Sequence, residues 1–276
     1  MLNMKEFIPP VVINIKRRLQ KNKFLYYYGK YNTWEEAVSA AENIGGGYEK
    51  PNIFQAEKEA MKKVINGGAA YEQDGILFYE KSVHFQILSS LLYAYSHIGS
   101  ICVIDFGGAL GSMYFRHRDE LRGLKIDWNV LEQKHFVDYG KDNIKNIGFY
   151  YTLEECFEEK KANFVLFSSV LGYLPNGLEA MEQCMKNGIE YICVDSTGFF
   201  MDERPEQIMI QHVPDTIYRA EYPIHIFNRD DLYKIIEEQK YHIVFQWSRE
   251  GIPIKNKFGC QRTNYEGFLI EKNRGL

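Results

Sequence analysis

The sequence predicts an α/β fold with a Rossmann-like, mostly parallel sheet, and three observations indicate this class. From residue 101 onward, short apolar segments rich in branched residues alternate with helix-favouring segments, as in a parallel sheet with crossover helices. The first apolar segment, ICVIDF at 101–106, ends in a glycine-rich turn of the kind that receives cofactors. No helix is expected between the last two apolar segments, so these should pair as an antiparallel hairpin.

The strands and helices of this sheet are expected in a regular order. Each strand is a short apolar run bounded by polar or glycine positions. The expected strands lie at residues 101–106, 127–132, 147–151, 163–170, 189–196, 241–248 and 265–272. The expected helices lie at residues 110–122, 133–143, 153–161, 176–186 and 229–240. Pro175 precedes the fourth of these helices, and Asn228, a good N-cap residue, precedes the fifth.

Two regions depart from this alternation. Residues 1–99 are expected to form a mostly helical N-terminal cap, with helices at 33–44, 55–66 and 86–98. Thr33 and Glu36 form a capping box at the start of the first of these helices. Residues 197–227 hold three prolines and no clear period, so they are expected to be an insertion or lid. The chain thus divides into a cap at 1–99 and a cofactor-binding domain at 100–276.

Composition limits the classes of function. The 276 residues are 45% hydrophobic, enough for a sizeable core, and no apolar run reaches the ~20 residues of a membrane span. The five cysteines are odd in number and form no C-x-x-C pair, which favours a cytoplasmic location and no metal site. The net charge of −4 argues against a nucleic-acid partner. Residues 11–28 combine basic and aromatic residues, which leaves open a weak peripheral contact with an anionic membrane.

The turn VIDFGGALGS, residues 103–112, can be compared with three cofactor-binding motifs. The phosphate-binding P-loop requires a lysine, and this turn has none. The dinucleotide motif G-x-G-x-x-G fails whether it starts at Gly107 or at Gly108. The third motif, D/E-x-G-x-G-x-G, fits at Asp105, Gly107 and Gly111, with Ala109 in place of the middle glycine. This third motif is the first motif of class I methyltransferases.

A second acid strengthens the third motif. Glu132 ends the second expected strand, next to the strand that ends at Asp105. An acid at that position can accept hydrogen bonds from ribose hydroxyls, as it does in dinucleotide folds. Glu132 could also be a solvated strand end, but the acid and glycines one strand earlier favour a cofactor role.

The chain resembles one family of bacterial class I S-adenosylmethionine-dependent methyltransferases that has no assigned substrate. The resemblance spans roughly residues 34–270 and is carried by YEQDGILF, DFGGALGSMYF, WNVLEQ, LFSSVLGYLPN, VDSTGF and YRAEYPIHIF. It implies a seven-stranded sheet whose last strand is inserted antiparallel, and S-adenosylmethionine as cofactor. The cofactor-binding residues implied by motif and resemblance are Asp105, Phe106, Gly107, Gly108, Ala109, Gly111, Ser112, Tyr114, Glu132, Gln133, Ser168 and Ser169.

Candidates for the chemistry are fewer. Asp195 ends the fifth expected strand, on the same sheet edge as Asp105 and Glu132, where ligands of open α/β sheets bind. His225 is the best candidate for a general base, although a packed residue on an apolar segment is an equally good interpretation. Tyr173 could line the pocket. The fourth strand lacks the N/D-P-P-Y/F sequence of many amino-group methyltransferases, which favours an oxygen acceptor.

The sequence therefore supports the hypothesis of an S-adenosylmethionine-dependent methyltransferase. Its acceptor would be a small molecule or a sugar-containing precursor of a surface polymer. Two alternatives remain open: a nicotinamide-dependent oxidoreductase, and a ligand-binding protein with a degenerate methyltransferase fold. Ala109 favours the second alternative if its methyl group obstructs the cofactor.

Overall fold

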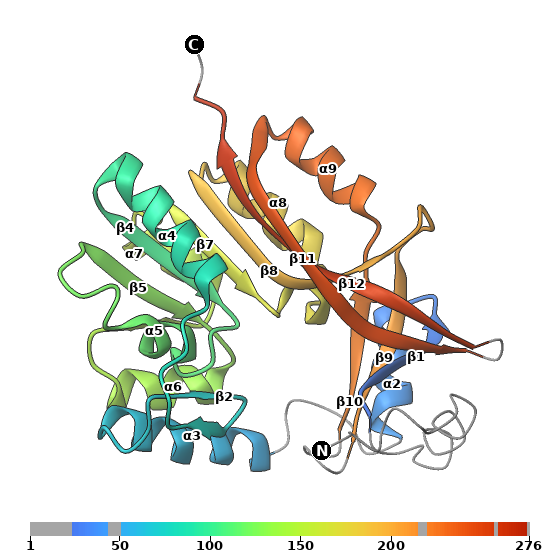
Figure 1. Cartoon of the computed structure of the whole chain (residues 1–276), viewed down its shortest axis with the longest axis horizontal. Helices are drawn as coiled ribbons and strands as arrows, with labels where there is room; N and C mark the ends of the chain where they lie inside the picture. Colours follow the sequence, from blue (N-terminus) through green and yellow to red (C-terminus); the bar gives the residue numbers. More distant parts are fainter. Residues whose placement is uncertain (1–23, 44–50, 215–219, 257–258, 275–276) are drawn as a thin grey trace, which may run out of the picture.

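The structure is a computed structural model that describes residues 24–43, 51–214, 220–256 and 259–274. Its centre is one large mixed sheet with helices on both faces (Figure 1). The sheet has ten strands in the order β10-β9-β1-β11-β12-β8-β7-β4-β5-β6. The strands are β1 (Tyr26–Tyr31), β4 (Ile101–Phe106), β5 (Ile126–Leu131), β6 (Gly148–Tyr150), β7 (Phe164–Ser168), β8 (Tyr191–Phe200), β9 (Gln207–Val213), β10 (Ala220–Ile226), β11 (Tyr241–Asn256) and β12 (Gly259–Lys272). A separate small sheet pairs β2 (Tyr71–Gln73) with β3 (Ile76–Phe78).

Within the described residues, the helices alternate with the strands from β4 to β8. They are α2 (Trp34–Glu42), α3 (Pro51–Ile65), α4 (Phe85–Ile98), α5 (Ser112–His117), α6 (Lys134–Asn143), α7 (Leu153–Glu159), the short 3₁₀ helix η2 (Leu171–Tyr173), α8 (Gly177–Lys186) and α9 (Arg229–Glu238). Thr33 caps α2 as predicted, because its hydroxyl accepts a hydrogen bond from the Glu36 backbone N–H at 3.2 Å. Asn228 caps α9 in the same way, accepting from Asp230 N–H at 2.9 Å.

The predicted α/β class and the closing hairpin are confirmed. Strands β6, β5, β4, β7 and β8 are parallel, and β12 pairs antiparallel with both β8 and β11. The expected strand count of seven is wrong, because β1, β9 and β10 extend the sheet beyond β11. The extension depends on the length of β11 and β12. Residues 249–264, expected as a polar loop, mostly continue these two strands, and Ile254 of β11 pairs with Tyr27 of β1.

The segment expected as an irregular lid, residues 197–227, is mostly strand. It contains the end of β8 together with β9 and β10. Its prolines conceal this from a sequence-based prediction, since proline is rare inside sheets. Pro223 is tolerated because β10 is the edge strand, where a missing N–H donor need not break the sheet.

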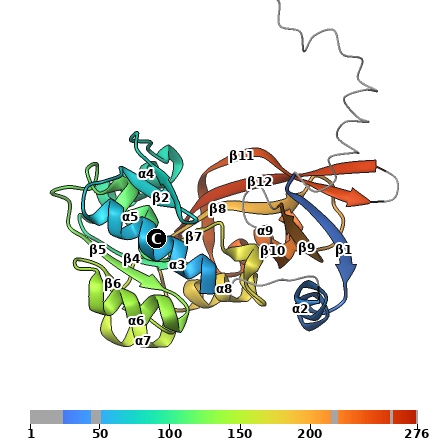
Figure 2. The same ribbon diagram turned by 90° about the horizontal axis from the view of Figure 1, so that it is seen from below.

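The three helices expected in the N-terminal residues are present as α2, α3 and α4, but β1 of this region belongs to the large sheet. In Figures 1 and 2, β1 and α2 lie at the β9–β10 end of the molecule, whereas α3, β2 and α4 lie at the opposite end. Residues 11–23 of the expected membrane-contacting segment lie outside the described residues, while Tyr27 within it is fully buried in β1. Within the described ranges, no helix is long and apolar enough to cross a bilayer.

The two faces of the sheet carry separate apolar layers. Residues of α3, α4, α5 and α6 pack with Trp128 and Leu166 on one face, which we call the α4 face. Residues of α7, α8 and α9 pack with Phe167 on the other face. Because side chains alternate along a strand, Asp105 follows Val103 onto the α4 face, and Asp195 follows Cys193 onto it. Both acids therefore lie on one face of the sheet, toward the carboxyl ends of the parallel strands.

Candidate functional site

The turn between β4 and α5 is built from left-handed backbone conformations. Gly107, Ala109 and Gly111 have φ angles of 68°, 50° and 85°. A left-handed alanine costs about 1–2 kcal/mol, so Ala109 stores strain in this turn. Gly108 is required for a different reason, since a Cβ there would lie 2.5 Å from the carboxylate of Asp105. The turn thus passes directly over that carboxylate.

The two acids predicted to bind the cofactor lie at the carboxyl ends of adjacent strands. Asp105 is 2% exposed and accepts a hydrogen bond from Trp128 Nε1 at 3.1 Å. Burial raises the pKa of Asp105 to about 7; the Trp128 hydrogen bond opposes the rise and the nearby Glu132 adds to it. Glu132 is partly buried, and burial raises its pKa to about 7 as well. Both carboxyls thus lie in an environment that disfavours their charge.

The N-terminal segment adds acids that the sequence analysis did not assign to the cofactor site. Glu57 on α3 is 7% exposed, and its Oε2 atom has no hydrogen-bond partner among the described residues. Burial, together with the charges of Glu72, Asp74 and Glu132, raises the pKa of Glu57 to about 8. Glu72 and Asp74 belong to the YEQDG block, which is the sequence feature that could have indicated these acids.

Glu72 joins the N-terminal segment to the glycine turn. It is 2% exposed and accepts hydrogen bonds from the hydroxyl of Ser112, in the first turn of α5, and from Gly75 N–H at 3.0 Å. We call Glu57, Glu72, Asp74, Asp105 and Glu132 the carboxylate cluster. None of these five residues forms an ion pair with a Lys, Arg or His of the described chain.

A second polar group is centred on Asp195 of β8, which is 2% exposed. Its Oδ1 accepts a hydrogen bond from Trp247 Nε1 at 2.8 Å, and its Oδ2 lies 2.7 Å from Ser196 Oγ and 3.3 Å from His84 Nε2. Burial alone would raise the pKa of Asp195, but the bonds from His84, Ser196 and Trp247 together hold it below its usual value. The Trp247 ring crosses Gly267 of β12, where a Cβ would approach it to 2.1 Å.

The serines predicted to bind the cofactor lie beside Asp195. Ser168 is opposite Asp195 in the register of β7 and β8. Ser169 has a left-handed φ of 56°, and its N–H donates to the Asp195 carbonyl at 3.0 Å. His84, the histidine that reaches this group, was not among the predicted site residues, because no motif marks it in the sequence.

The other predicted cofactor residues take varied positions. Tyr114 packs on Trp128 on the α4 face, with ring centroids 5.8 Å apart. Phe106 stacks on Phe167 at 5.1 Å on the opposite face. Gln133 is exposed at the N-cap of α6. Of these three, Phe106 is the one whose ring packs on the face away from the cluster.

Two of the predicted catalytic residues, His225 and Tyr173, have contacts with residues other than Asp195. The His225 ring is stacked between Trp34 and Phe227, with centroid distances of 4.8 and 5.6 Å. Its Nδ1 contacts Glu206, and its Nε2 lies 3.1 Å from the Pro175 carbonyl. Tyr173 donates to Gln211 Oε1. The catalytic roles of His225 and Tyr173 stay predictions.

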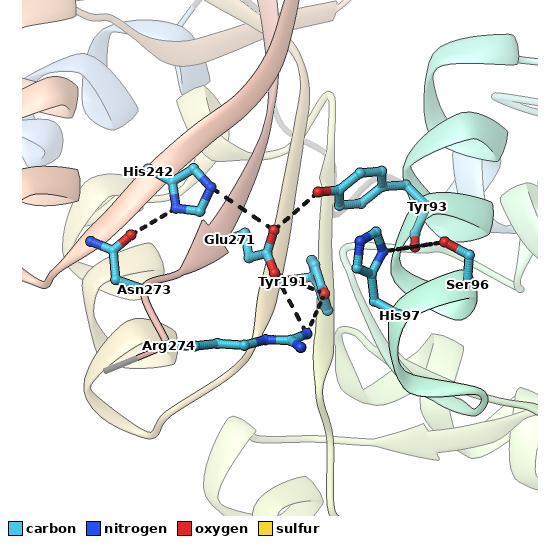
Figure 3. A network of polar contacts seen from close by, with 8 residues as sticks. All are labelled: Tyr93, Ser96, His97, Tyr191, His242, Glu271, Asn273 and Arg274. Carbon is cyan, nitrogen blue, oxygen red and sulfur yellow. Dashed lines mark hydrogen bonds and ion pairs between the residues drawn. The ribbon is translucent and has the colours of Figure 1, made fainter. Parts of the chain in front are cut away.

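The opposite, amino edge of the sheet carries the polar network of Figure 3. A cavity of about 480 Å³ lies beside it. Glu271 of β12 accepts hydrogen bonds from Tyr191 at 3.0 Å and from Tyr93 at 3.2 Å. Arg274 and His242 lie 3.6 and 3.9 Å from its carboxylate. Because the side chains of this network satisfy one another, we assign it to the joining of α4, β8, β11 and β12. The chemistry of a ligand site points instead to the carboxyl edge.

Comparison with known proteins finds similarity only in structure. No protein-family model matches the chain, and no curated protein matches it. The N-terminal domain of EvdMO1, determined in the presence of SAH and D-fucose, is 12% identical, with a TM-score of 0.49 over 82% of this chain and 97% of that one. An S-adenosylmethionine-dependent methyltransferase from Clostridium acetobutylicum is 8% identical, with a TM-score of 0.43 over 80% of this chain and 99% of that one.

A third similar structure is the glycopeptide N-methyltransferase MtfA complexed with (S)-adenosyl-L-methionine. It is 10% identical, with a TM-score of 0.43 over 68% of this chain and 94% of that one. Similarity at these identities concerns the fold and not the substrate.

Proposed function

We propose that this chain is an S-adenosylmethionine-dependent methyltransferase whose cofactor binds at the glycine turn. The observation that carries the proposal is the carboxylate cluster, which surrounds the turn and has no cationic partner within the described chain. Asp74 is exposed and Glu132 is half-buried, whereas Glu57, Glu72 and Asp105 are buried. Buried charges in proteins are normally paired, so these three carboxyls call for a positively charged ligand. S-adenosylmethionine brings an ammonium and a sulfonium group, together with a ribose diol.

The residues present fit the parts of that cofactor. Asp105 and Glu57 offer carboxylates to its cationic groups, and Glu132 offers one to its ribose hydroxyls. Gly108 keeps the turn free of side-chain atoms above Asp105. When bound, the cofactor supplies an electrophilic methyl group. The chain then has to orient an acceptor toward that group, exclude water and, for a protic acceptor, remove a proton.

The same cluster argues against a nicotinamide cofactor. In dinucleotide folds, the pyrophosphate lies at the N-terminus of the helix that follows the glycine turn. Here the carboxylate of Glu72 accepts from Ser112, in the first turn of that helix, so a protein anion lies where the phosphates would bind. Two phosphates at the turn would also meet the charge of Asp105 beneath Gly108, and like charges repel.

The proposed acceptor rests on the sequence at the end of β7. The missing N/D-P-P-Y/F sequence at the end of β7 favours oxygen over an amino group. We propose O-methylation of a small molecule or of a sugar-containing surface-polymer precursor, in the cytoplasm. The strained Ala109 supports retained chemistry, because backbone strain persists where the surrounding structure and a function maintain it.

Calorimetry tests the proposed cofactor. Wild-type protein is expected to bind S-adenosylmethionine, to bind S-adenosylhomocysteine more weakly because it lacks the sulfonium charge, and not to bind NADH. Glu132→Gln should weaken S-adenosylmethionine binding about tenfold, the value of one charge-assisted hydrogen bond. Glu154→Gln is the matched control, since Glu154 is exposed on α7. Failure to bind S-adenosylmethionine, or tighter binding of NADH, would refute the proposal.

Turnover separates an enzyme from a ligand-binding protein. Wild-type protein and methyl-labelled S-adenosylmethionine are incubated with a dialysable extract of small molecules, and labelled products are separated by chromatography. An enzyme yields labelled product that disappears with Gly108→Val, whose side chain collides with Asp105. Cofactor binding without any labelled product would identify a non-catalytic protein.

A further inference from the structure

We infer that His84 is the general base of this site, oriented by Asp195, and that the group it deprotonates is a hydroxyl. This assignment presupposes the methyltransferase function proposed above and adds the class of acceptor. It places the base on the N-terminal part of the chain, at the start of α4.

The position of His84 follows from the lengths of α4 and β4. Helix α4 has 14 residues and spans about 21 Å, and β4 has six residues and spans about 20 Å. Only Gly99 and Ser100 connect them, so α4 returns antiparallel along the sheet and its first turn lies over the carboxyl ends of the strands. His84, the N-cap residue of α4, is thereby placed at the edge where Asp105 and Asp195 lie.

Asp195 lies at a distance from Asp105 that leaves room for an acceptor between the cofactor and the base. It is on the α4 face, opposite Ser168, and two strands from Asp105, which is about 10 Å across the sheet. A cofactor held at Asp105 and Glu132 and a base held at Asp195 would therefore flank the end of β7. An acceptor bound there would lie between the methyl donor and the base.

The His84 ring is held at one nitrogen, and its backbone is held separately. Its Nε2 lies 3.3 Å from Asp195 Oδ2, and Asp195 is itself held by Trp247 and Ser196. The backbone N–H of His84 donates to His117 Nε2 at 3.0 Å, and the Nδ1 of His117 lies 2.9 Å from the Met113 carbonyl. The His117 contact fixes the start of α4, and the Asp195 contact favours the tautomer in which Nε2–H points at Asp195.

The remaining ring nitrogen of His84 has no partner. Nδ1 is buried and forms no hydrogen bond with any described residue. A neutral imidazole that donates through Nε2 has a lone pair at Nδ1, and leaving such an atom buried and unpaired costs about 1–3 kcal/mol. A hydroxyl group of a bound acceptor would satisfy it. In His225, by contrast, both ring nitrogens already contact protein oxygens, of Glu206 and Pro175, so neither is open to an acceptor.

The proposed step transfers the methyl group to the acceptor's oxygen and the acceptor's proton to His84. The acceptor's hydroxyl proton passes to Nδ1 of His84 while its oxygen forms a bond to the methyl carbon. The carbon–sulfur bond breaks, and its electron pair stays on sulfur, which becomes a neutral thioether. The imidazolium that forms on His84 is stabilised by the adjacent Asp195 carboxylate, and it returns its proton to solvent when product leaves.

A spectroscopic experiment on the full chain tests the assignment. The protein is labelled with ¹⁵N-histidine, and the His84 ring signals are assigned by their loss in His84→Gln. The neutral ring should carry its proton on Nε2, and the Nδ1 signal should shift when S-adenosylmethionine is added. His97, on the last turn of the same helix, serves as control and should not respond.

Activity and binding complete the test. His84→Gln keeps a side-chain N–H for Asp195 but has no base, so labelled methyl transfer to the small-molecule extract should fall about 100-fold or more. The affinity of His84→Gln for S-adenosylmethionine should stay close to that of wild type. In the control His97→Gln, both methyl transfer and this affinity should stay close to wild type. A proton on Nδ1, an unresponsive signal, or unchanged transfer in His84→Gln overturns the base assignment alone. If wild-type protein does not bind S-adenosylmethionine, the proposed function itself fails.

Discussion

Two buried glutamates at opposite edges of the molecule differ in how their charge is satisfied. Glu271, at the amino edge, is 9% exposed and is surrounded by two tyrosine hydroxyls, a histidine and an arginine (Figure 3). Glu57, beside the glycine turn, is 7% exposed, has an unpaired oxygen and faces other carboxylates. Similar burial thus accompanies opposite electrostatics.

The difference separates structure from function. A buried carboxylate with donors on every side contributes to joining the elements that supply those donors. A buried carboxylate among other carboxylates costs folding free energy until a cation binds. Proteins tolerate that cost mainly at functional sites, where perturbed groups gather. We therefore expect substitutions at the two edges to change stability in opposite directions.

The largest effect is expected at the amino edge. Glu271→Leu removes the acceptor of the buried Tyr191 hydroxyl and of the partly buried Tyr93 hydroxyl, and the free energy of unfolding should fall by about 3 kcal/mol. Urea denaturation measures this loss. Tyr93→Phe removes one of the two donors and should cost about 1 kcal/mol. Binding of S-adenosylmethionine should be unchanged in both variants; a stability unaffected by Glu271→Leu would contradict the structural role of the network.

At the carboxyl edge we expect a substitution to raise the free energy of unfolding instead of lowering it. Glu57→Gln replaces a carboxyl that must either bury its charge or take up a proton on folding, so the unliganded protein should become more stable by about 1 kcal/mol at neutral pH. The same change should weaken S-adenosylmethionine binding about threefold to tenfold, because one attraction to the cation is lost. Urea denaturation and calorimetry measure the two effects. Loss of stability in Glu57→Gln would show that the native carboxylate already has a stabilising partner.

The same carboxyls predict a dependence of stability on pH. Asp105 and Glu57 have pKa values raised to about 7 and about 8, so both are protonated at pH 5.5 and become charged as pH rises. A raised carboxyl pKa stabilises the fold below its unfolded value, and that contribution is lost as pH rises through the folded value. The stability of the unliganded protein should therefore decline between about pH 5 and 8.

Cofactor binding should show the opposite trend. A cation favours the charged carboxylates, so S-adenosylmethionine affinity should rise between about pH 5.5 and 7.5, with protons released on binding. Calorimetry in buffers of different ionisation enthalpy detects that release. Glu57→Gln should reduce the number of protons released. Affinity that falls over this range would mean that the cluster does not face the cofactor's cationic groups.

Much of the fold could be predicted from local pattern. The strands that end at Phe106 and Ser168 are short apolar runs, and their order along the chain determines a parallel sheet with crossover helices. The hairpin of β11 and β12 could be predicted in kind but not in length. Its outer half is polar in sequence and becomes strand because β1 and β9 complete the sheet beside it.

The candidate site could be predicted only where a motif spans neighbouring residues. Asp105, Gly107 and Gly111 follow one another in a single turn, so their spacing alone indicates a cofactor site. Glu57 and His84 lie outside any such spacing, and each acts through residues distant in the chain. Their burial and their unpaired atoms could be recognised only once α3 and α4 were packed against the sheet.

The sequence by itself determined the α/β class, the glycine turn after the first parallel strand and the acids that end two adjacent strands, because these depend on local preferences and on the two-residue period of a strand. The tertiary structure alone decided which carboxylates meet at the turn, which of them lack a cation and which histidine reaches Asp195. Those outcomes depend on burial and on distances between segments far apart in the chain, and no local pattern of residues contains them.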